Sequence, residues 1–314
     1  MMENIKSVIQ QRPCMANPVR PFCSKEATAR YRRNIMKKLQ YTFKTDTLFK
    51  MLFVKYPELL KGLVAELLGI PLESIGTFTI KNPEMPPENL GDKFCRLDIN
   101  MTVNGRQVDL EVQVSNEGDY PERVMYYWAR EFSSALLTGQ GYSELPRTII
   151  ISIIDFVQFD CVEYHSFFQP LEAMRHTLLS DKMGFHFFEL PKLPGEVKED
   201  NMLLLWLSLF KAETEEDLEK IKEMEVPVMS QAINAYYTIT ASSEFREKER
   251  LRAKARHDEA QALYNARREA SREARQEEKI EIARKLLTRN RPIEEIVEDT
   301  GLTYEEVEDL RIKS

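Results

Sequence analysis

Apolar and polar residues alternate along two neighbouring stretches near the middle of the chain. Residues 96–103 and 106–114 each carry an apolar side chain at every second position, which predicts two strands with one apolar and one polar face. Asn104-Gly105 lies between them, and this dipeptide favours a two-residue β-turn because both residues tolerate positive φ. The pattern therefore predicts an antiparallel β-hairpin.

Other apolar patterns predict the remaining elements. A near-continuous apolar run at 147–154 is typical of a strand that is buried on both faces. Further strands are expected at 76–81, 163–168 and 185–189. Helical spacing of apolar residues predicts helices at 46–53, 59–68, 119–139, 200–211 and 214–240. The alternation of helices and strands predicts an α/β fold.

The last part of the chain has a different composition. Residues 243–289 are rich in Ala, Glu, Arg and Lys, which predicts one solvated helix about 70 Å long. Two short helices, 293–300 and 304–311, flank Gly301-Leu302-Thr303. The predicted organisation is a basic, largely mobile arm at 1–40, an α/β domain with extra C-terminal helices at 41–242, the long helix at 243–290, and a small pair resembling a helix-turn-helix at 291–314.

Charge is distributed unevenly around a formal net charge of -7. Residues 1–40 hold nine basic residues against two acidic ones, whereas residues 41–243 hold 18 against 31. This excludes a uniformly basic DNA-coating protein but allows a basic arm on an acidic body. No apolar stretch is long enough for a membrane span, and four widely spaced cysteines favour a reducing cytoplasmic location.

The hairpin fixes a strand register. With a two-residue turn, Val103 faces Arg106, so the numbers of paired residues sum to 209. Asp98 then lies opposite Glu111, and Arg96 lies opposite Gln113. Two facing carboxylates repel each other, and a fold tolerates them if the face is wet or if a cation binds there. Mg²⁺ prefers carboxylate oxygen ligands.

Two further residues share this polar face. Asp109 adds a third acid opposite Asn100, and Gln113 could orient an attacking water through its amide. The alternative is that all of these are ordinary outward polar residues of an amphipathic hairpin. In either case we expect neither Asp98 nor Glu111 to pack in the core.

Several motifs together resemble a known family. The motifs are Thr45-Asp46-Thr-Leu-Phe49-Lys50-Met-Leu-Phe53, Arg96-Leu-Asp98-Ile, Val108-Asp-Leu-Glu111-Val-Gln113 and Tyr120-Pro-Glu-Arg123-Val-Met-Tyr126-Tyr127. They resemble the PD-(D/E)XK nuclease family transposases, in the branch of recombination-promoting nucleases (Rpn) and putative transposases. The likeness extends over residues 41–160, and it would make 41–242 a PD-(D/E)XK nuclease-like domain.

The resemblance implies both a fold and an activity. The implied fold is a restriction-endonuclease-like αβββαβ core with a mixed central sheet. The implied activity is hydrolysis of DNA phosphodiester bonds with Mg²⁺, or Mn²⁺ in its place, linked to recombination or transposition. Asp98 and Glu111 would be metal ligands, Gln113 would stand at the lysine position, and Asp46 would be the first-helix acid, with Lys50 one turn later.

Gln113 departs from the family pattern because it carries no positive charge. Lys50 or Arg96 could supply that charge, the metal could act alone, or catalysis could be feeble. The competing hypothesis is therefore a catalytically weak or inactive scaffold that binds DNA or protein.

One predicted helix face carries candidate DNA-binding residues. Arg123, Tyr127 and Arg130 recur at positions i, i+4 and i+7, where they could contact phosphates and stack on a base. The alternative is a helix packed on the sheet with its arginines reaching to solvent. Arg96 is a further candidate. DNA is the expected partner, and RNA is the alternative substrate, because the sequence does not distinguish the two. Cutting of both strands would suit a homodimer. No P-loop or GxGxxG motif is present, so no organic cofactor is expected.

Overall fold

The structure is a computed structural model that describes residues 37–81, 84–85, 95–96, 98–136 and 139–312. Most of the basic arm expected at 1–40 lies outside the described residues. Its mobility therefore stays a prediction. Within the described part of the chain, no helix is both long enough and apolar enough to cross a membrane.

A six-stranded mixed sheet forms the centre of the molecule, in the order β1-β4-β5-β6-β8-β7. Its strands are β1 (Phe78–Ile80), β4 (Ile99–Val103), β5 (Arg106–Gln113), β6 (Thr148–Ile154), β8 (Met183–Glu189) and β7 (His165–Phe168). β5, β6 and β8 are parallel neighbours, whereas β1, β4 and β7 pair antiparallel. All seven residues of β6 are buried, which confirms the strand predicted from its continuous apolar run.

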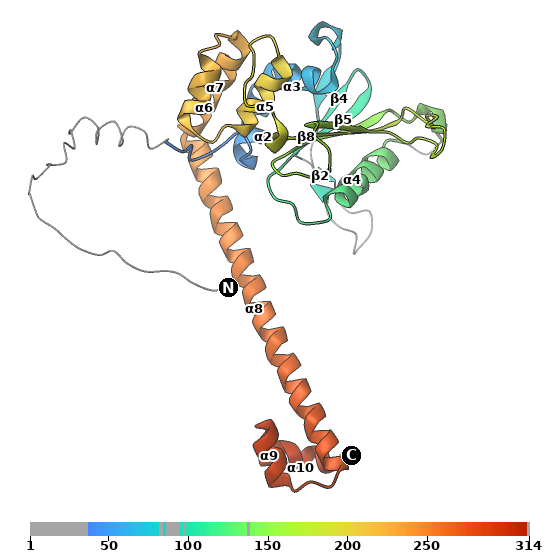
Figure 1. The fold of residues 1–314 in the computed structure, drawn as a ribbon, viewed down its shortest axis with the longest axis vertical. Helices are drawn as coiled ribbons and strands as arrows, with labels where there is room; N and C mark the ends of the chain where they lie inside the picture. Colours follow the sequence, from blue (N-terminus) through green and yellow to red (C-terminus); the bar gives the residue numbers. More distant parts are fainter. Residues whose placement is uncertain (1–36, 82–83, 86–94, 97, 137–138, 313–314) are drawn as a thin grey trace, which may run out of the picture.

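Helices cover both faces of this sheet (Figure 1). On one face lies a layer formed by α2 (Asp46–Lys55), α3 (Pro57–Leu68), α5 (Met202–Lys211), α6 (Glu215–Lys222) and α7 (Pro227–Thr240). This layer and the apolar residues of β4, β5 and β6 form one large core. The opposite face is covered by α4 (Tyr120–Ser134), which packs on β6 and β8. The chain order α2, β1, β4, β5, α4, β6 confirms the predicted αβββαβ core.

The predicted hairpin and its register are confirmed. Asn104 and Gly105 adopt φ values of 49° and 74° at the turn. Val103 pairs with Arg106, and Ile99 pairs with Leu110, so the numbers of paired residues sum to 209. The Asn104 side chain also accepts hydrogen bonds from two backbone N–H groups that precede β1, which anchors the turn to the neighbouring strand.

The strand predicted at 96–103 is interrupted at Asp98. Cys95–Arg96 form a separate strand, β3, which pairs with β2 (Glu84–Met85). The prediction that Arg96 faces Gln113 is therefore wrong, because Arg96 pairs with Glu84. Asp98 lies in a bend, where hydrogen bonds involving side chains take the place of the regular ladder (described below).

Two helix boundaries also differ from the prediction. The helix expected over 119–139 ends at Ser134, where the hydroxyls of Ser133 and Ser134 bond to carbonyls of the preceding turn and compete with the helical pattern. The helix expected over 214–240 is two helices, α6 and α7. Glu225 adopts φ 54° between them, and Pro227 begins α7, as is common for a proline at the first helical position.

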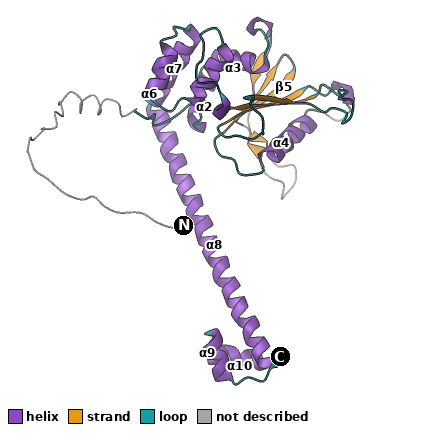
Figure 2. Ribbon diagram, viewed as in Figure 1, coloured by secondary structure: helices purple, strands orange, loops and turns teal. Residues whose placement is uncertain are grey.

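A single long helix extends away from the sheet (Figures 1 and 2). α8 spans Ser243–Thr288, which confirms the long helix predicted there. It ends in a small unit with α9 (Ile293–Thr300) and α10 (Tyr304–Ile312), held together by a separate apolar cluster around Ile296 and Val307. Short 3₁₀ turns occupy Leu72–Ser74, Tyr142–Glu144 and Leu190–Lys192. The proposed division into four regions stays a prediction.

Candidate active site

Asp98 and Glu111 are bound to each other at the open end of the hairpin. The backbone N–H of Asp98 donates to Glu111 Oε1 at 2.9 Å, and the backbone N–H of Val112 donates to Asp98 Oδ2 at 3.0 Å. These bonds continue the β4–β5 register past Ile99 although the regular ladder has ended. The predicted proximity of the two acids is confirmed.

The polar face of the hairpin is not open to water. Glu111 is 7% exposed and Asp109 only 1% exposed, because α4 lies over this side of the sheet. The expectation that neither site acid packs in the protein interior is therefore wrong for Glu111. Sequence alternation identifies which residues share a face, but it does not reveal that another element covers that face.

Burial gives this acidic face unusual electrostatics. Desolvation, followed by the charge of Asp98, raises the pKa of Glu111 from its ordinary value of 4.5 to about 8. The Asp98 N–H, Lys50 and Arg123 oppose this rise. The pKa of Asp109 is also raised well above its usual range, by desolvation first and then by the charges of Glu111, Asp98 and Glu131.

Asp109 has an unmet need for a donor. Within the described part of the chain, neither of its carboxylate oxygens receives a hydrogen bond from a protein N–H or O–H group. Its neighbour Glu111 is close enough to share a proton with it. Leaving a buried acceptor unpaired is costly, so a proton or a cation is needed to offset the charge on this face.

The donor set suits a hard divalent cation. Asp98 and Glu111 offer adjacent carboxylate oxygens, which Mg²⁺ and Mn²⁺ prefer, and the surrounding negative charge is only partly compensated. Among the described residues, however, no three His, Cys, Asp or Glu side chains are already arranged as a metal-binding group. These residues fit a cation that is held by two carboxylates and whose remaining coordination positions are filled by water or substrate oxygens.

Lys50 connects the first helix to the acid pair. Its Nζ atom lies 3.1 Å from Asp98 Oδ1 and 2.6 Å from Asp46 Oδ1. Asp46 and Lys50 are one turn apart on α2, as the sequence predicted. Asp46 also forms an ion pair with Arg252 of α8. Sequence analysis missed Arg252, because a contact across more than 200 residues leaves no local pattern.

Gln113 points its amide at its own loop. Its Nε2 donates to the carbonyl of Ser115 at 2.9 Å, and its backbone carbonyl accepts the N–H of Asp155 at 2.9 Å. This bond uses one of the two Nε2 donors, so the second N–H and the amide oxygen could still contact a water molecule. Gln113, at the position where the family pattern has a lysine, therefore carries no charge, and the structure shows its side chain bonded to Ser115 and not to Asp98 or Glu111.

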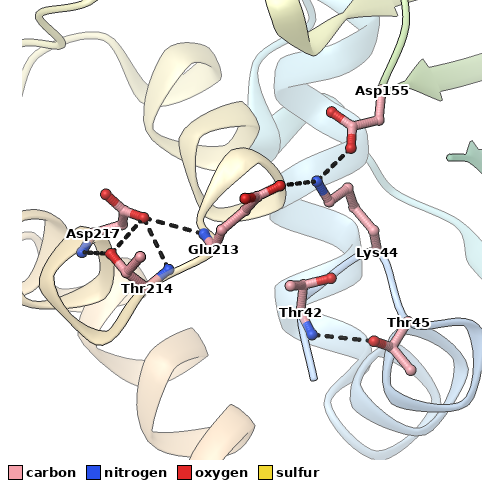
Figure 3. A network of polar contacts seen from close by, with 7 residues as sticks. All are labelled: Thr42, Lys44, Thr45, Asp155, Glu213, Thr214 and Asp217. Atoms are coloured by element: carbon pink, nitrogen blue, oxygen red, sulfur yellow. Dashed lines mark hydrogen bonds and ion pairs between the residues drawn. The ribbon is translucent and has the colours of Figure 1, made fainter. Parts of the chain in front are cut away.

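A buried lysine near this strand end was also missed. Lys44, with a side chain only 6% exposed, places Nζ 2.5 Å from Asp155 Oδ2 and 3.6 Å from Glu213 Oε1. Figure 3 shows Lys44 between these two acids, beside the Thr214 and Asp217 cap of α6. Both contacts join segments far apart in sequence. Lys44 thus fastens the start of α2 to the end of β6.

The candidate DNA-binding residues are dispersed. Arg96 belongs to the separate β2–β3 pair. Arg123, Tyr127 and Arg130 are half-buried on α4. Arg123 lies over the Tyr120 ring at 5.0 Å and pairs with Glu117 at 3.3 Å, and Tyr127 packs against the apolar cluster beneath α4. Much of this face of α4 therefore packs on the sheet, as the alternative interpretation of the sequence expected.

Comparison with known families agrees with this geometry. A family model described as "PD-(D/E)XK nuclease family transposase" matches residues 43–266, a range that contains the αβββαβ core, the acid pair and the first part of α8. Comparisons with curated proteins and with solved structures found no match. The match covers more than half of the chain and supports a nuclease-like or transposase-like role. The chain belongs to the PD-(D/E)XK nuclease family transposases.

Proposed function

We propose that this protein is a Mg²⁺-dependent DNA endonuclease that hydrolyses phosphodiester bonds in recombination or transposition. The observation that carries the proposal is the pair of hydrogen bonds that holds the two acids together, from the Asp98 N–H to Glu111 and from the Val112 N–H to Asp98, with Lys50 at 3.1 Å from Asp98. Asp98 and Glu111 would hold the divalent cation. When bound, such a cation lowers the pKa of a coordinated water and stabilises negative charge on a phosphate oxygen.

Lys50 is our candidate for the positive charge that Gln113 lacks. Its ammonium group lies beside the acid pair and is held there by Asp46 on the same helix face. An ammonium group in this position would offset charge that develops on the phosphate during hydrolysis. Gln113, while bonded to Ser115 through Nε2, would orient the attacking water through its amide oxygen.

DNA would approach from the side of the open hairpin end. Arg123 is near enough to Glu111 to lower its pKa, so a phosphate at the acids would lie within reach of this guanidinium. Arg96, Tyr127 and Arg130 would contribute contacts farther along the backbone. Two copies of the protein would be needed to cut both strands symmetrically.

One observation favours a second candidate function, a scaffold that binds nucleic acid or protein without turnover. Lys50 already neutralises Asp98 by a direct ion pair, and Asp98 Oδ2 is engaged by the Val112 N–H. A site that satisfies its own charges has less need of a cation. The two functions predict different products from the same DNA.

Supercoiled plasmid separates these two functions. Wild-type protein should nick or linearise it with Mg²⁺ and leave it intact with EDTA. Asp98→Asn and Glu111→Gln preserve side-chain shape and should leave the plasmid intact under both conditions. Binding by wild type without new DNA ends would support the scaffold instead. Cleavage by Asp98→Asn equal to wild type would overturn the assignment of the site and indicate a contaminating nuclease.

A further inference from the structure

The long helix α8 begins against the candidate active site and not at a distance from it. Ser242 caps its first turn by accepting a hydrogen bond from the Phe245 N–H at 3.2 Å. Phe245 is fully buried and meets Tyr41 edge-on, with ring centroids 4.8 Å apart. One turn later, Glu249 is buried and accepts a hydrogen bond from the Thr47 hydroxyl of α2. These contacts fix the rotation of α8 about its own axis.

That rotation directs Arg252 at Asp46. Glu249 and Arg252 are three residues apart and so lie on the same side of α8, facing Thr47 and Asp46 in the first turn of α2. Arg252 pairs with Asp46 Oδ2. Its side chain is 29% exposed, which leaves it only partly screened by water.

Asp46 passes this contact on to the acid pair. Its other oxygen, Oδ1, lies 2.6 Å from Lys50 Nζ, and the same Nζ lies 3.1 Å from Asp98 Oδ1. Charges therefore alternate along the path Arg252, Asp46, Lys50, Asp98. Lys50 is shared between two carboxylates, and Arg252 compensates one of them.

Loss of Arg252 would disturb this sharing. Asp46 would retain its full negative charge with Lys50 as its remaining ion-pair partner among the described residues, so the ammonium group would be drawn toward Asp46 and away from Asp98. Asp98 would then be freer to bind a cation, while the charge needed beside the phosphate would be displaced. Loss of Arg252 should therefore raise the affinity for the metal but lower the rate of cleavage.

We propose that Arg252 is a positioning residue of the nuclease site, acting on Lys50 through Asp46, so that the start of α8 is part of the catalytic machinery. This inference rests on the proposed function for its cleavage readout. The proposal also gives the first turns of α8 a function that the charge pattern of this helix does not indicate. The family match extends through residue 266 and so includes these turns of α8.

The test compares Arg252→Ala, Arg252→Lys and Arg250→Ala. Arg250 is a matched control, because it lies on the same helix with a side chain 64% exposed and pairs with Glu247. Single-turnover cleavage of a DNA duplex by Arg252→Ala should slow by about 10- to 100-fold, as small misplacements of a reacting group do. The Kd for DNA in EDTA should stay within about threefold of wild type.

A second readout does not depend on cleavage. Titration calorimetry with Mg²⁺ alone should show Arg252→Ala binding the metal about fivefold more tightly than wild type, a usual size for coupling between two sites. Arg252→Lys should restore both properties in large part, and Arg250→Ala should change neither. In an Asp46→Asn background, Arg252→Ala should have little additional effect, because the connection is already broken.

Specific outcomes would overturn the proposal. Unchanged cleavage rate and Mg²⁺ affinity in folded Arg252→Ala would do so. So would a loss confined to DNA affinity, with a weaker salt dependence, since that would make Arg252 a phosphate contact. Wild-type protein that cuts no DNA defeats the proposed function alone, and the Mg²⁺ titrations then still decide whether Arg252 acts on Lys50.

Discussion

At the β4–β5 hairpin, the two faces of the central sheet have opposite characters although the same strands form them. On the face toward α2, α3 and α5, the alternate apolar residues of β4, β5 and β6 join one large core, and all of them are buried except Val112, which is half-buried. On the face toward α4, Asp109 and Glu111 are almost as buried, yet they carry carboxylates with elevated pKa values. Figure 2 shows helices on both sides of the strands.

The difference separates stability from function. The apolar face gains free energy from removal of hydrocarbon from water. The acidic face loses free energy by desolvating charge without full compensation. A sheet with one strongly stabilising face can keep an unfavourable arrangement on the other, and such arrangements are common where a cation or a substrate binds.

Glu111→Gln should have the largest effect, and it should act on activity. Removal of one candidate metal ligand should slow Mg²⁺-dependent DNA cleavage by about 10³-fold, equivalent to about 4 kcal/mol in the activation barrier. The unfolding free energy should not fall, because Gln keeps the shape of the Glu111 side chain and an oxygen that can still accept the Asp98 N–H. Glu163→Gln, an exposed acid, is the control. Normal cleavage by Glu111→Gln would contradict this account.

Ile151→Ala tests the opposite face. Ile151 is fully buried and pairs with Leu110 in the middle of the sheet, so its truncation should lower the unfolding free energy by about 2–5 kcal/mol. Cleavage per folded molecule should remain normal. Denaturant titration measures the loss, with Val162→Ala, at a side chain 88% exposed, as the control. A selective loss of cleavage would mean that the two faces are not independent.

Asp109→Asn should give a smaller change of opposite sign. The substitution replaces a buried carboxyl group, which must either take up a proton or carry a desolvated charge, by a neutral amide that can donate to Glu111, so at neutral pH the unfolding free energy should rise by about 1–3 kcal/mol. The same denaturant titration applies, with the exposed Asp160→Asn as its control. Destabilisation by Asp109→Asn would show that the carboxylate has a stabilising partner.

The smallest expected effect is a gradual change of stability with pH. The folded state raises the pKa of Glu111 from 4.5 to about 8, so it holds a proton that the unfolded chain releases. The contribution of Glu111 to stability in EDTA should therefore be complete below about pH 4.5 and should be lost as pH rises toward about 8. Glu111→Gln should flatten this decline. Thermal unfolding across this pH range measures the effect, and a profile identical to that of wild type would count against the raised pKa.

The sequence was informative where a local rule fixed the geometry. Asn104-Gly105 set the turn, and the turn set the register that brings Asp98 and Glu111 together. Asp46 and Lys50 were predictable as neighbours because they are one helical turn apart. These short-range rules were sufficient for the hairpin and the acid pair, whereas the αβββαβ core was expected from the family resemblance.

Tertiary packing determined what the sequence did not reveal. The bend at Asp98 arises from its own backbone and side-chain hydrogen bonds with β5. The burial of Glu111 depends on α4, and the contacts of Lys44 and Arg252 join segments more than 100 residues apart. No local periodicity carries that information, so these features appear only once the chain is folded.

The most direct test of the acidic face is titration calorimetry of Mg²⁺ into the wild-type protein, Asp98→Asn and Glu111→Gln at neutral pH. We predict a saturable binding heat for wild type that is lost in both variants, since each removes one of two adjacent carboxylates. Equal Mg²⁺ affinity in all three proteins would contradict the claim that Asp98 and Glu111 together hold a cation.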